Sequence, residues 1–469
     1  MMPFEPQSLQ DPRVAIARTS RGYDESTAEA EAARAIARVT SLLGWSDQRR
    51  GPFGNIVFEG ARVLIKPNFV MHKNEGHWGI EPLITHPSVV RATVEAALQA
   101  GAAEVKVGDA PIQGCDFDEL LRATGLDRWA SNLMREEPRF LGIHDFRRTT
   151  CEFVNGVRVA AENLVPEDHF VLFDLSGESL LEPVTDGEHP FRVTCYDPRL
   201  LATTHSPRRH QYLVAREAIE ADVVINLPKL KTHKKAGVTC ALKNLIGING
   251  NKEYLPHHRI GGSETGGDCY PGASRIKRAL EFTLDRQNMA SSGTTARIWS
   301  EVATNLTRLS SLTGDRLGVE GSWSGNNTVW RTGLDLNRVL LYGRLDASMA
   351  ERPQRRVVHL VDAVTAGQGD GPLRPQPLQL GLIFAGSNAP AVDLVASHLL
   401  GYVPQRIPLV RESFEQFRWP LSSIAPDEVA VAGDLGDGKA AEILTAMELA
   451  AEVIYPEGWR DAALNPACD

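Results

Sequence analysis

The sequence predicts an α/β protein with a mixed, largely parallel sheet of β-α-β units, arranged as two lobes with a cleft between them. The first observation behind this prediction is a strand–helix–strand succession near the N-terminus. Residues 61–70 have the composition of a strand, residues 85–101 that of a helix, and residues 104–110 that of a second strand. Pro87 in the first turn and Gly101 past the end bound the helix as expected. This spacing is typical of a right-handed β-α-β unit.

The second observation is a set of short apolar strands later in the chain. Residues 223–225 are β-branched and are followed by Pro228, as expected for a buried strand that ends in a loop. Residues 356–364 and 380–387 predict two more strands, and residues 391–401 predict a helix that ends at a glycine. We expect these C-terminal strands to return to the sheet and complete the core.

The length of 469 residues exceeds the roughly 100–200 residues of a single domain, so several parts are expected. An Ala/Glu/Arg-rich helix is predicted over residues 26–43. The predicted parts are an N-terminal lead-in (1–60), an α/β lobe with a Lys/His loop (61–262), a helical or irregular insertion or lid (263–330), and a C-terminal α/β part (331–469).

Composition and charge restrict the classes of function. A net charge of −9 argues against binding to nucleic acid or to an acidic membrane surface. No stretch reaches the ~18–20 apolar residues of a membrane span, and the N-terminal residues lack the pattern of a secretion signal, which favours the cytoplasm. The six cysteines contain no Cys-x-x-Cys pair, which argues against an iron–sulfur cluster, a zinc knuckle or a disulfide framework. The sequence gives no indication of the oligomeric state.

The strongest candidate for a site is the segment that follows the strand at 223–225. A predicted loop carries the cations Lys229, Lys231, His233, Lys234 and Lys235. In α/β sheets, ligands bind just beyond the carboxyl ends of strands, so a cationic loop there favours an anionic ligand. The alternative interpretation is a solvated basic loop.

Two residues of this segment are predicted to be catalytic. Residues 237–246 are expected to be helical, so that Thr239 and Lys243 share a face and backbone amides cap an oxyanion. Lys243 lies among apolar residues that lower the pKa of an amine, which suits acid–base or covalent catalysis. His233 is a candidate general base or metal ligand, and nearby lysines favour its neutral form. The alternative for Lys243 is an ion pair with an acid or a contact with the end of a strand.

Further residues are predicted to line the same cleft. Lys66 ends a strand and is followed by a proline, so it is expected to point a cation into the cleft. His257 and His258 are expected in a mobile, substrate-facing loop. The predicted substrate-binding set is Lys66, Asn68, Lys229, Lys231, Thr239, Asn244, His258, Asn327, Trp330 and Arg331. Asp109, Asp362 and Asp370 are either ligands of a divalent metal or residues that stabilise turns, and for Asp109 a further alternative is that it orients Lys66.

An ordered series of motifs resembles the bacterial and archaeal family catalogued as domain of unknown function 362. The motifs include Lys66-Pro-Asn, Asn226-Leu-Pro-Lys-Leu-Lys-Thr-His, Leu242-Lys-Asn-Leu-Ile-Gly and Gly367-Gln-Gly-Asp-Gly-Pro. Trp323-Ser-Gly-Asn-Asn-Thr-Val-Trp-Arg resembles a signature of the longer members that lack a ferredoxin segment. Other members carry such Cys-rich segments, and their absence from this sequence weakens an electron-transfer role.

A second resemblance, over about 40 residues, is to the nickel-pincer lactate racemases. Ala221-Asp, His233-x-x-Ala-Gly and Lys243 occur in the order and spacing of that family, where the lysine holds the pincer cofactor. Gly108-Asp-Ala-Pro replaces the turn that carries a catalytic histidine in those enzymes. The resemblance therefore implies a shared fold more than a shared reaction.

These observations predict an enzyme that acts on a small carboxylated or phosphorylated metabolite in a cleft lined by Lys, His and Arg, with a divalent metal as an additional candidate. The sequence does not identify the cofactor, the substrate or the reaction. The first alternative is an isomerase related to the nickel-pincer enzymes, or a cofactor-dependent redox catalyst. The second is a non-catalytic protein that binds the same ligand.

Overall fold

The protein is built around one large mixed sheet, as the sequence predicts. The computed structural model describes residues 7–154, 157–161, 165–290, 293–312, 317–446 and 453–464. Within these residues the sheet has 11 strands, and six of its strand pairs are parallel. The order along the main path is β18 (Gly438–Lys439), β17 (Ala430–Gly433), β1 (Arg13–Arg18), β16 (Gln376–Gly386), β15 (Arg356–Gln368), β11 (Val223–Leu227), β2 (Arg62–Pro67), β3 (Glu104–Asp109) and β4 (Phe140–Asp145).

The predicted β-α-β unit is present. Strands β2 and β3 are parallel neighbours, in register from Arg62 opposite Glu104 onward. Helix α3 (Pro87–Gln99) connects them. The ring of His86 caps this helix by accepting the backbone N–H of Ser88, and Pro87 occupies the first turn.

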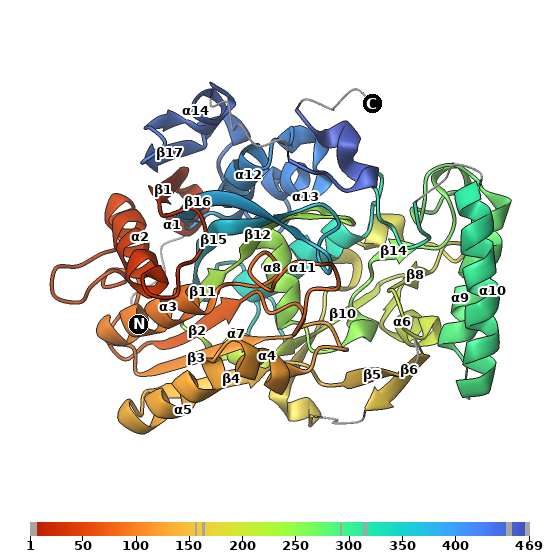
Figure 1. Cartoon of the computed structure of the whole chain (residues 1–469), viewed down its shortest axis with the longest axis horizontal. Coiled ribbons are helices and arrows are strands. Elements are labelled where there is room, and N and C mark those ends of the chain that lie inside the picture. Colours follow the sequence, from red (N-terminus) through yellow and green to blue (C-terminus); the bar gives the residue numbers. More distant parts are fainter. Residues whose placement is uncertain are drawn as a thin grey trace.

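Helices cover both faces of the sheet, so the central strands contribute to two separate cores (Figure 1). Strand β1 illustrates the alternation: Ala15 and Ala17 pack in the core beneath α2 (Ala28–Leu42) and α3, while Val14 and Ile16 pack on the opposite face with α12 (Ala389–Leu399). A third core contains residues of α11 (Val329–Tyr342). The strands are therefore largely apolar on both faces, as in a buried parallel sheet.

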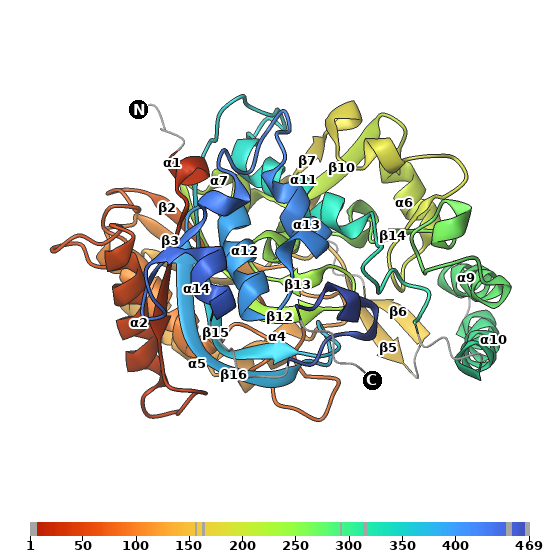
Figure 2. The same ribbon diagram turned by 90° about the horizontal axis from the view of Figure 1, so that it is seen from above.

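A helical hairpin lies at one edge of the molecule. It consists of α9 (Arg275–Asn288) and α10 (Gly293–Leu312), which pack against each other. Figure 1 places this hairpin beyond β8 (Phe191–Arg192) and β14 (His258–Arg259), and Figure 2 also shows it beyond β14, away from the central sheet. The predicted helical character of this stretch is therefore present. No helix among the described residues is long and apolar enough to cross a membrane.

Two local predictions are wrong. The expected loop after Pro228 is strand β12 (Lys229–His233), which pairs with β15 and with β13 (Gly237–Thr239). The helix expected over residues 237–246 is confined to α8 (Ala241–Asn244) and a following 3-10 turn. Strand β12 was not predicted because it contains cationic residues, whereas buried strands are recognised in a sequence by their apolar side chains.

Candidate functional site

Strand β12 directs three of the predicted site residues to one face. Side chains alternate along a strand, so Lys229, Lys231 and His233 share a face. Thr239 of β13 lies directly opposite Lys231. All four residues are buried. The alternation of side chains along this strand therefore brings these residues together, which a loop would not do.

Two of the buried lysines form ion pairs with the predicted metal-binding aspartates. The Nζ atom of Lys229 lies 2.7 Å from Oδ2 of Asp362, and the Nζ atom of Lys66 lies 2.7 Å from Oδ1 of Asp109. Burial lowers the pKa of both lysines, and each aspartate opposes that effect. These two cations were predicted to face an anionic ligand, but protein carboxylates already balance their charge.

Neighbouring residues fix both ion pairs. The hydroxyl of Tyr23 donates a short hydrogen bond to Asp362, whose other oxygen accepts the backbone N–H of His86 at 2.9 Å. Lys66 also donates to Oδ1 of Asn244 at 3.1 Å. A Cβ atom at Gly247 would lie 2.6 Å from the Lys66 Nζ atom and even closer to Asp109. The pair of Lys66 and Asp109 therefore requires glycine at that position.

Lys231 and Lys243 differ from Lys66 and Lys229 because neither forms an ion pair with a carboxylate of the described chain. Lys231 donates to Oδ1 of Asn68 at 2.7 Å and to the carbonyl of Leu83 at 2.5 Å, both uncharged acceptors. Lys243 on α8 is partly exposed, and within the described chain its ammonium has no hydrogen-bonding or ionic partner. Burial and the charges of Lys235 and Lys66 lower the pKa of Lys243 to about 8.

His233 lies in the same cluster of cations. Its Nδ1 atom accepts the backbone N–H groups of Lys235 at 3.0 Å and Ala236 at 3.2 Å. The neutral ring therefore carries its proton on Nε2. Burial lowers the pKa of His233 well below its usual value, and Lys243 and Lys231 lower it further. The neutral form is the one predicted from the sequence.

The carboxylate of Glu320 pairs with two further lysines of the cluster. Glu320 lies 2.5 Å from Nζ of Lys234 and 3.6 Å from Nζ of Lys235. Burial opposes its ionisation, but Lys235 and Lys234 outweigh burial and lower its pKa to about 2. The alternative of a solvated basic loop is therefore wrong for Lys234, because this side chain is ion-paired. His258 is buried in β14 rather than placed in a mobile loop.

Several buried polar atoms in this region have no protein partner. Among the described residues these include Oγ1 of Thr239, Nδ1 of His257 and Nδ1 of His258. The pKa values of both histidines are lowered by burial and by Lys235. The site therefore combines unpaired cationic groups with unused donors and acceptors.

The predicted residues on α11 belong to a different network. The guanidinium of Arg331 stacks on the ring of Trp330 at 4.2 Å and donates to the backbone carbonyls of Asn327 at 2.9 Å and Leu180 at 2.8 Å. The backbone N–H of Asn327 donates to Asp268. Through these contacts Asn327, Trp330 and Arg331 position the start of α11. They are not part of the lysine cluster.

The structure does not assemble the predicted metal ligands. Asp109 and Asp362 are the countercharges of separate lysines, and the side chain of Asp370 is exposed. The described residues contain no group of three or more His, Cys, Asp or Glu side chains that could hold a metal ion. A metal role for these three aspartates stays a prediction.

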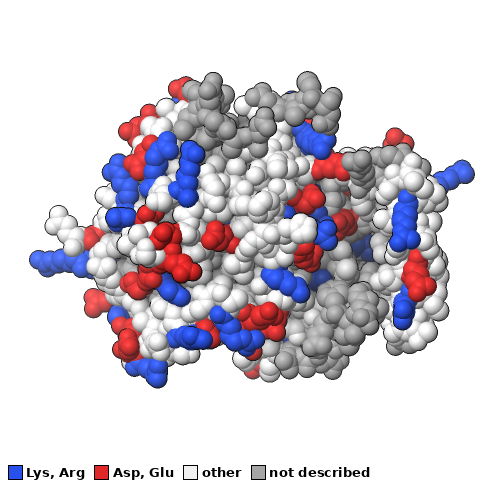
Figure 3. Space-filling model, in the orientation of Figure 1, with Lys and Arg blue, Asp and Glu red and all other residues white. Residues whose placement is uncertain are grey.

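Two members of the cluster, Tyr23 and Glu320, were not predicted. Lys235 was expected in the cationic loop and His257 in a mobile loop, but neither was given a catalytic or substrate-binding role. Tyr23 and Glu320 are distant in the sequence, and no local pattern marks them. The distribution of surface charge does not reveal the site. On the face shown in Figure 3, Lys/Arg and Asp/Glu side chains are intermixed, and most of the lysine cluster is buried.

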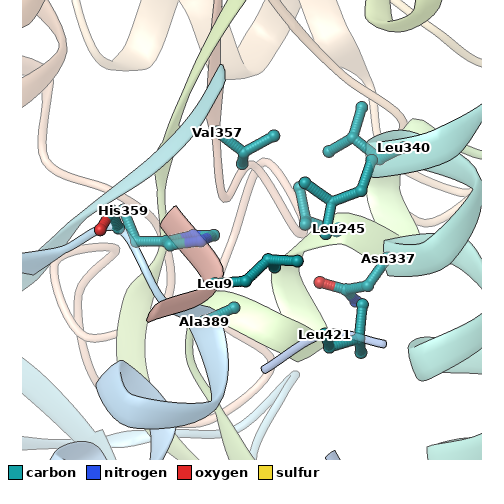
Figure 4. Close-up of a pocket in the computed structure, with 10 residues that line it drawn as sticks. Leu9, Leu245, Asn337, Leu340, Val357, His359, Ala389 and Leu421 are labelled. Atoms are coloured by element: carbon teal, nitrogen blue, oxygen red, sulfur yellow. The ribbon is translucent and has the colours of Figure 1, made fainter. Parts of the chain in front are cut away.

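A small cavity lies behind the site, between α11, α12 and β15. Its volume is about 10 Å³, close to the minimum for a single water molecule. Figure 4 shows His359, Leu245 and Asn337 among its lining residues. Nδ1 of His359 bonds to the amide of Asn226 at 3.0 Å, and burial lowers the pKa of this histidine to about 3. This cavity is too small for a metabolite.

Comparison with known proteins identifies relatives over most of the chain. Residues 63–165 and 189–398 match the family described as Domain of unknown function (DUF362). A thylakoid-associated protein of Synechocystis sp. is 23% identical over 380 residues, which are 81% of this chain and 74% of that protein.

Two solved structures are also similar. A Thermotoga maritima protein is 12% identical with a TM-score of 0.34, over 81% of this chain and 60% of that one. The lactate racemase apoprotein of Thermoanaerobacterium thermosaccharolyticum is 11% identical with a TM-score of 0.29, over 85% of this chain and 59% of that one. The chain thus spans about 60% of the length of both structures.

Proposed function

The chain belongs to the DUF362 family of proteins of unknown function, and from the geometry of its lysine cluster we propose that it is an enzyme acting on a small anionic metabolite. The proposed ligand carries a carboxylate or phosphate group. This group binds between Lys231, Lys243 and the Nε2–H group of His233. The observation that carries the proposal is the partly exposed amine of Lys243, which has no partner in the described chain.

The balance of charge supports an anion rather than a cation or a neutral group. Aspartates neutralise Lys66 and Lys229, whereas Lys231 has only neutral acceptors. Buried charge is costly unless it is paired, so an anion that reaches both Lys231 and Lys243 would offset part of that cost.

The lowered pKa of Lys243 supports a chemical role in addition to binding. An amine with a pKa of about 8 exchanges protons near neutral pH, where an ordinary lysine stays protonated. The Nε2–H group of neutral His233 donates a hydrogen bond to the same anion. In this proposal Lys243 takes up or releases the proton, and His233 and Lys231 hold the substrate.

Calorimetric titration with inorganic phosphate and with acetate tests the proposal without knowledge of the substrate. We expect at least one of these anions to bind, and Lys243→Ala to weaken that binding about 10- to 100-fold, the effect of losing a charged hydrogen bond. Lys439→Ala is the control, because this side chain is exposed on β18. Lys234→Ala is unsuitable as a control because Lys234 pairs with Glu320.

Two results would contradict the proposal. Neither anion binds the wild-type protein, or Lys243→Ala and Lys439→Ala change the affinity equally. Mass spectrometry and elemental analysis separate the alternatives. A covalent adduct on Lys243 or stoichiometric nickel would favour a cofactor-dependent catalyst, and anion binding without turnover of any metabolite would favour a binding protein.

A further inference from the structure

A second, larger cavity lies beside the lysine cluster. It is lined by residues of β8, β14, the α9–α10 hairpin and residues 317–320, it opens to solvent, and its volume is about 260 Å³. These elements lie toward the hairpin edge of the molecule in Figure 1. None of its lining residues belongs to the predicted substrate-binding set except His258.

The cavity adjoins the cluster through shared residues. Thr194 lines the cavity, and its hydroxyl accepts a hydrogen bond from Nζ of Lys235 at 2.7 Å. His258 and Glu320 line the cavity as well, and Glu320 lies 3.6 Å from the same ammonium. Lys235 in turn is one of the charges that lower the pKa of Lys243. Lys235 therefore links the wall of the cavity to the lysine cluster.

The charged groups in the cavity wall are largely paired within the protein. Arg192 binds Asp285 at 2.9 Å, and Glu320 is held by Lys234 at 2.5 Å. Glu281 is buried, and burial raises its pKa. A charged part of a ligand would lose its hydration here without gaining an unpaired countercharge.

The other side chains of the wall are of two kinds. Leu280, Leu284 and Ile260 are aliphatic, whereas residues such as Gln287 and Ser310 carry hydrogen-bonding groups. The buried Nδ1 atom of His258, which has no protein partner in the described chain, adds a further polar group. Such a wall suits a body that is partly aliphatic and partly hydroxylated.

We propose that this cavity is the specificity pocket of the enzyme and holds the uncharged body of the substrate, while the anionic group binds at Lys231 and Lys243. This inference rests on the proposed function. The substrate class is then a carboxylate or phosphate ester with a neutral, hydroxyl-bearing body. The body is compact, because the cavity is smaller than the ~300–1,000 Å³ typical of drug-sized ligands.

Two matched pairs of probes test the pocket: inorganic phosphate with a hexose monophosphate, and acetate with a hexonate. In the wild type we expect the larger member of at least one pair to bind about tenfold or more tightly, since its body gains the contacts of the cavity. Leu284→Trp fills the cavity and should abolish this gain, while the affinity for inorganic phosphate or acetate stays unchanged.

Leu309→Trp is the matched control, because Leu309 is 47% exposed on α10 and does not line the cavity. It should keep the gain. If Leu284→Trp fails to fold by circular dichroism, Ser311→Trp fills the cavity from the other helix. A gain that survives a folded cavity-filling variant, or no gain with either pair, would overturn the pocket while leaving the anion site intact. Failure of all four probes to bind would instead overturn the proposed function.

Discussion

The ammonium of Lys229 and the carboxylate of Asp362 lie 2.7 Å apart, and both side chains are completely buried. The two residues are also backbone neighbours, because β12 and β15 are in parallel register at this point. The pair therefore fixes the strand that carries Lys231 and His233. Its role is to position the site, while Lys231, which has only uncharged acceptors, and neutral His233 lie further along the same strand.

Removing one partner of this pair should destabilise the protein strongly. Lys229→Met leaves Asp362 buried without its countercharge, which typically costs about 3–5 kcal/mol of unfolding free energy. Urea denaturation measures the change. Arg34→Ala, which removes the 3.9 Å contact of an exposed side chain with Glu31, is the control and should change stability by less than about 1 kcal/mol. Equal effects of the two substitutions would mean that the buried pair is not important for the fold.

Gly247→Ala should disturb the pair of Lys66 and Asp109. The new Cβ atom would lie 2.6 Å from the Lys66 Nζ atom, so side chains or backbone must move, at a cost of about 1–3 kcal/mol. Gly79→Ala is the control, because its Cβ atom would have no neighbour within 4 Å. Thermal unfolding of both variants measures the difference. The close approach of the 3-10 turn Leu245–Ile248 to Lys66 and Asp109 would be contradicted if Gly247→Ala were as stable as the wild type.

Asp393 should make the stability of the protein depend on pH. Burial raises its pKa to about 7, and its carboxylate accepts the backbone N–H of Leu242 at 3.3 Å. The folded state therefore holds a proton that the unfolded state releases, so Asp393 weakens folding increasingly as pH rises toward 7. The stability of Asp393→Asn relative to wild type should increase by roughly 2 kcal/mol between pH 5.5 and 8.5. A constant difference across this range would contradict the raised pKa.

Anion binding should weaken as the solution becomes basic. Lys243 has a folded pKa of about 8, below its unfolded value, so its ammonium loses its proton above pH 8 and can no longer attract the anion. We expect the affinity for inorganic phosphate to fall by about tenfold from pH 7 to pH 9.5. Lys243→Arg, which stays protonated throughout, is the control for the second ionisation of phosphate near neutral pH and should not show this decrease. The same decrease in this variant would assign the effect to another group.

Much of the sheet could be predicted from the sequence because its strands are apolar. Strands β2, β3, β11, β15 and β16 and the helices that follow β2 and β16 lie where the hydrophobic pattern places them. Strand β12 was missed because three of its five residues are Lys or His, and its pairing with β15 is visible only in three dimensions.

The lysines of the site were predicted, but of their acidic partners only Asp109 was considered, as a residue that orients Lys66. Asp362, opposite Lys229, was interpreted as a metal ligand or a turn residue, since a sequence does not show which acid meets which base. Lys243 was identified from its apolar neighbours in the sequence. Burial is also the main cause of its lowered pKa. Glu320, which pairs with Lys234 and Lys235, could not be predicted because it is distant from them in the sequence and meets them only in the folded chain.

The most direct measurement is a ¹⁵N NMR titration of the Lys243 amine with and without inorganic phosphate, assigned with Lys243→Arg. We expect a pKa near 8 in the free protein. We expect a higher pKa when phosphate is present, because a bound anion favours the protonated amine. A pKa near the ordinary ~10.4 of lysine, unchanged by phosphate, would contradict the claim that Lys243 is an unpaired cation awaiting an anionic ligand.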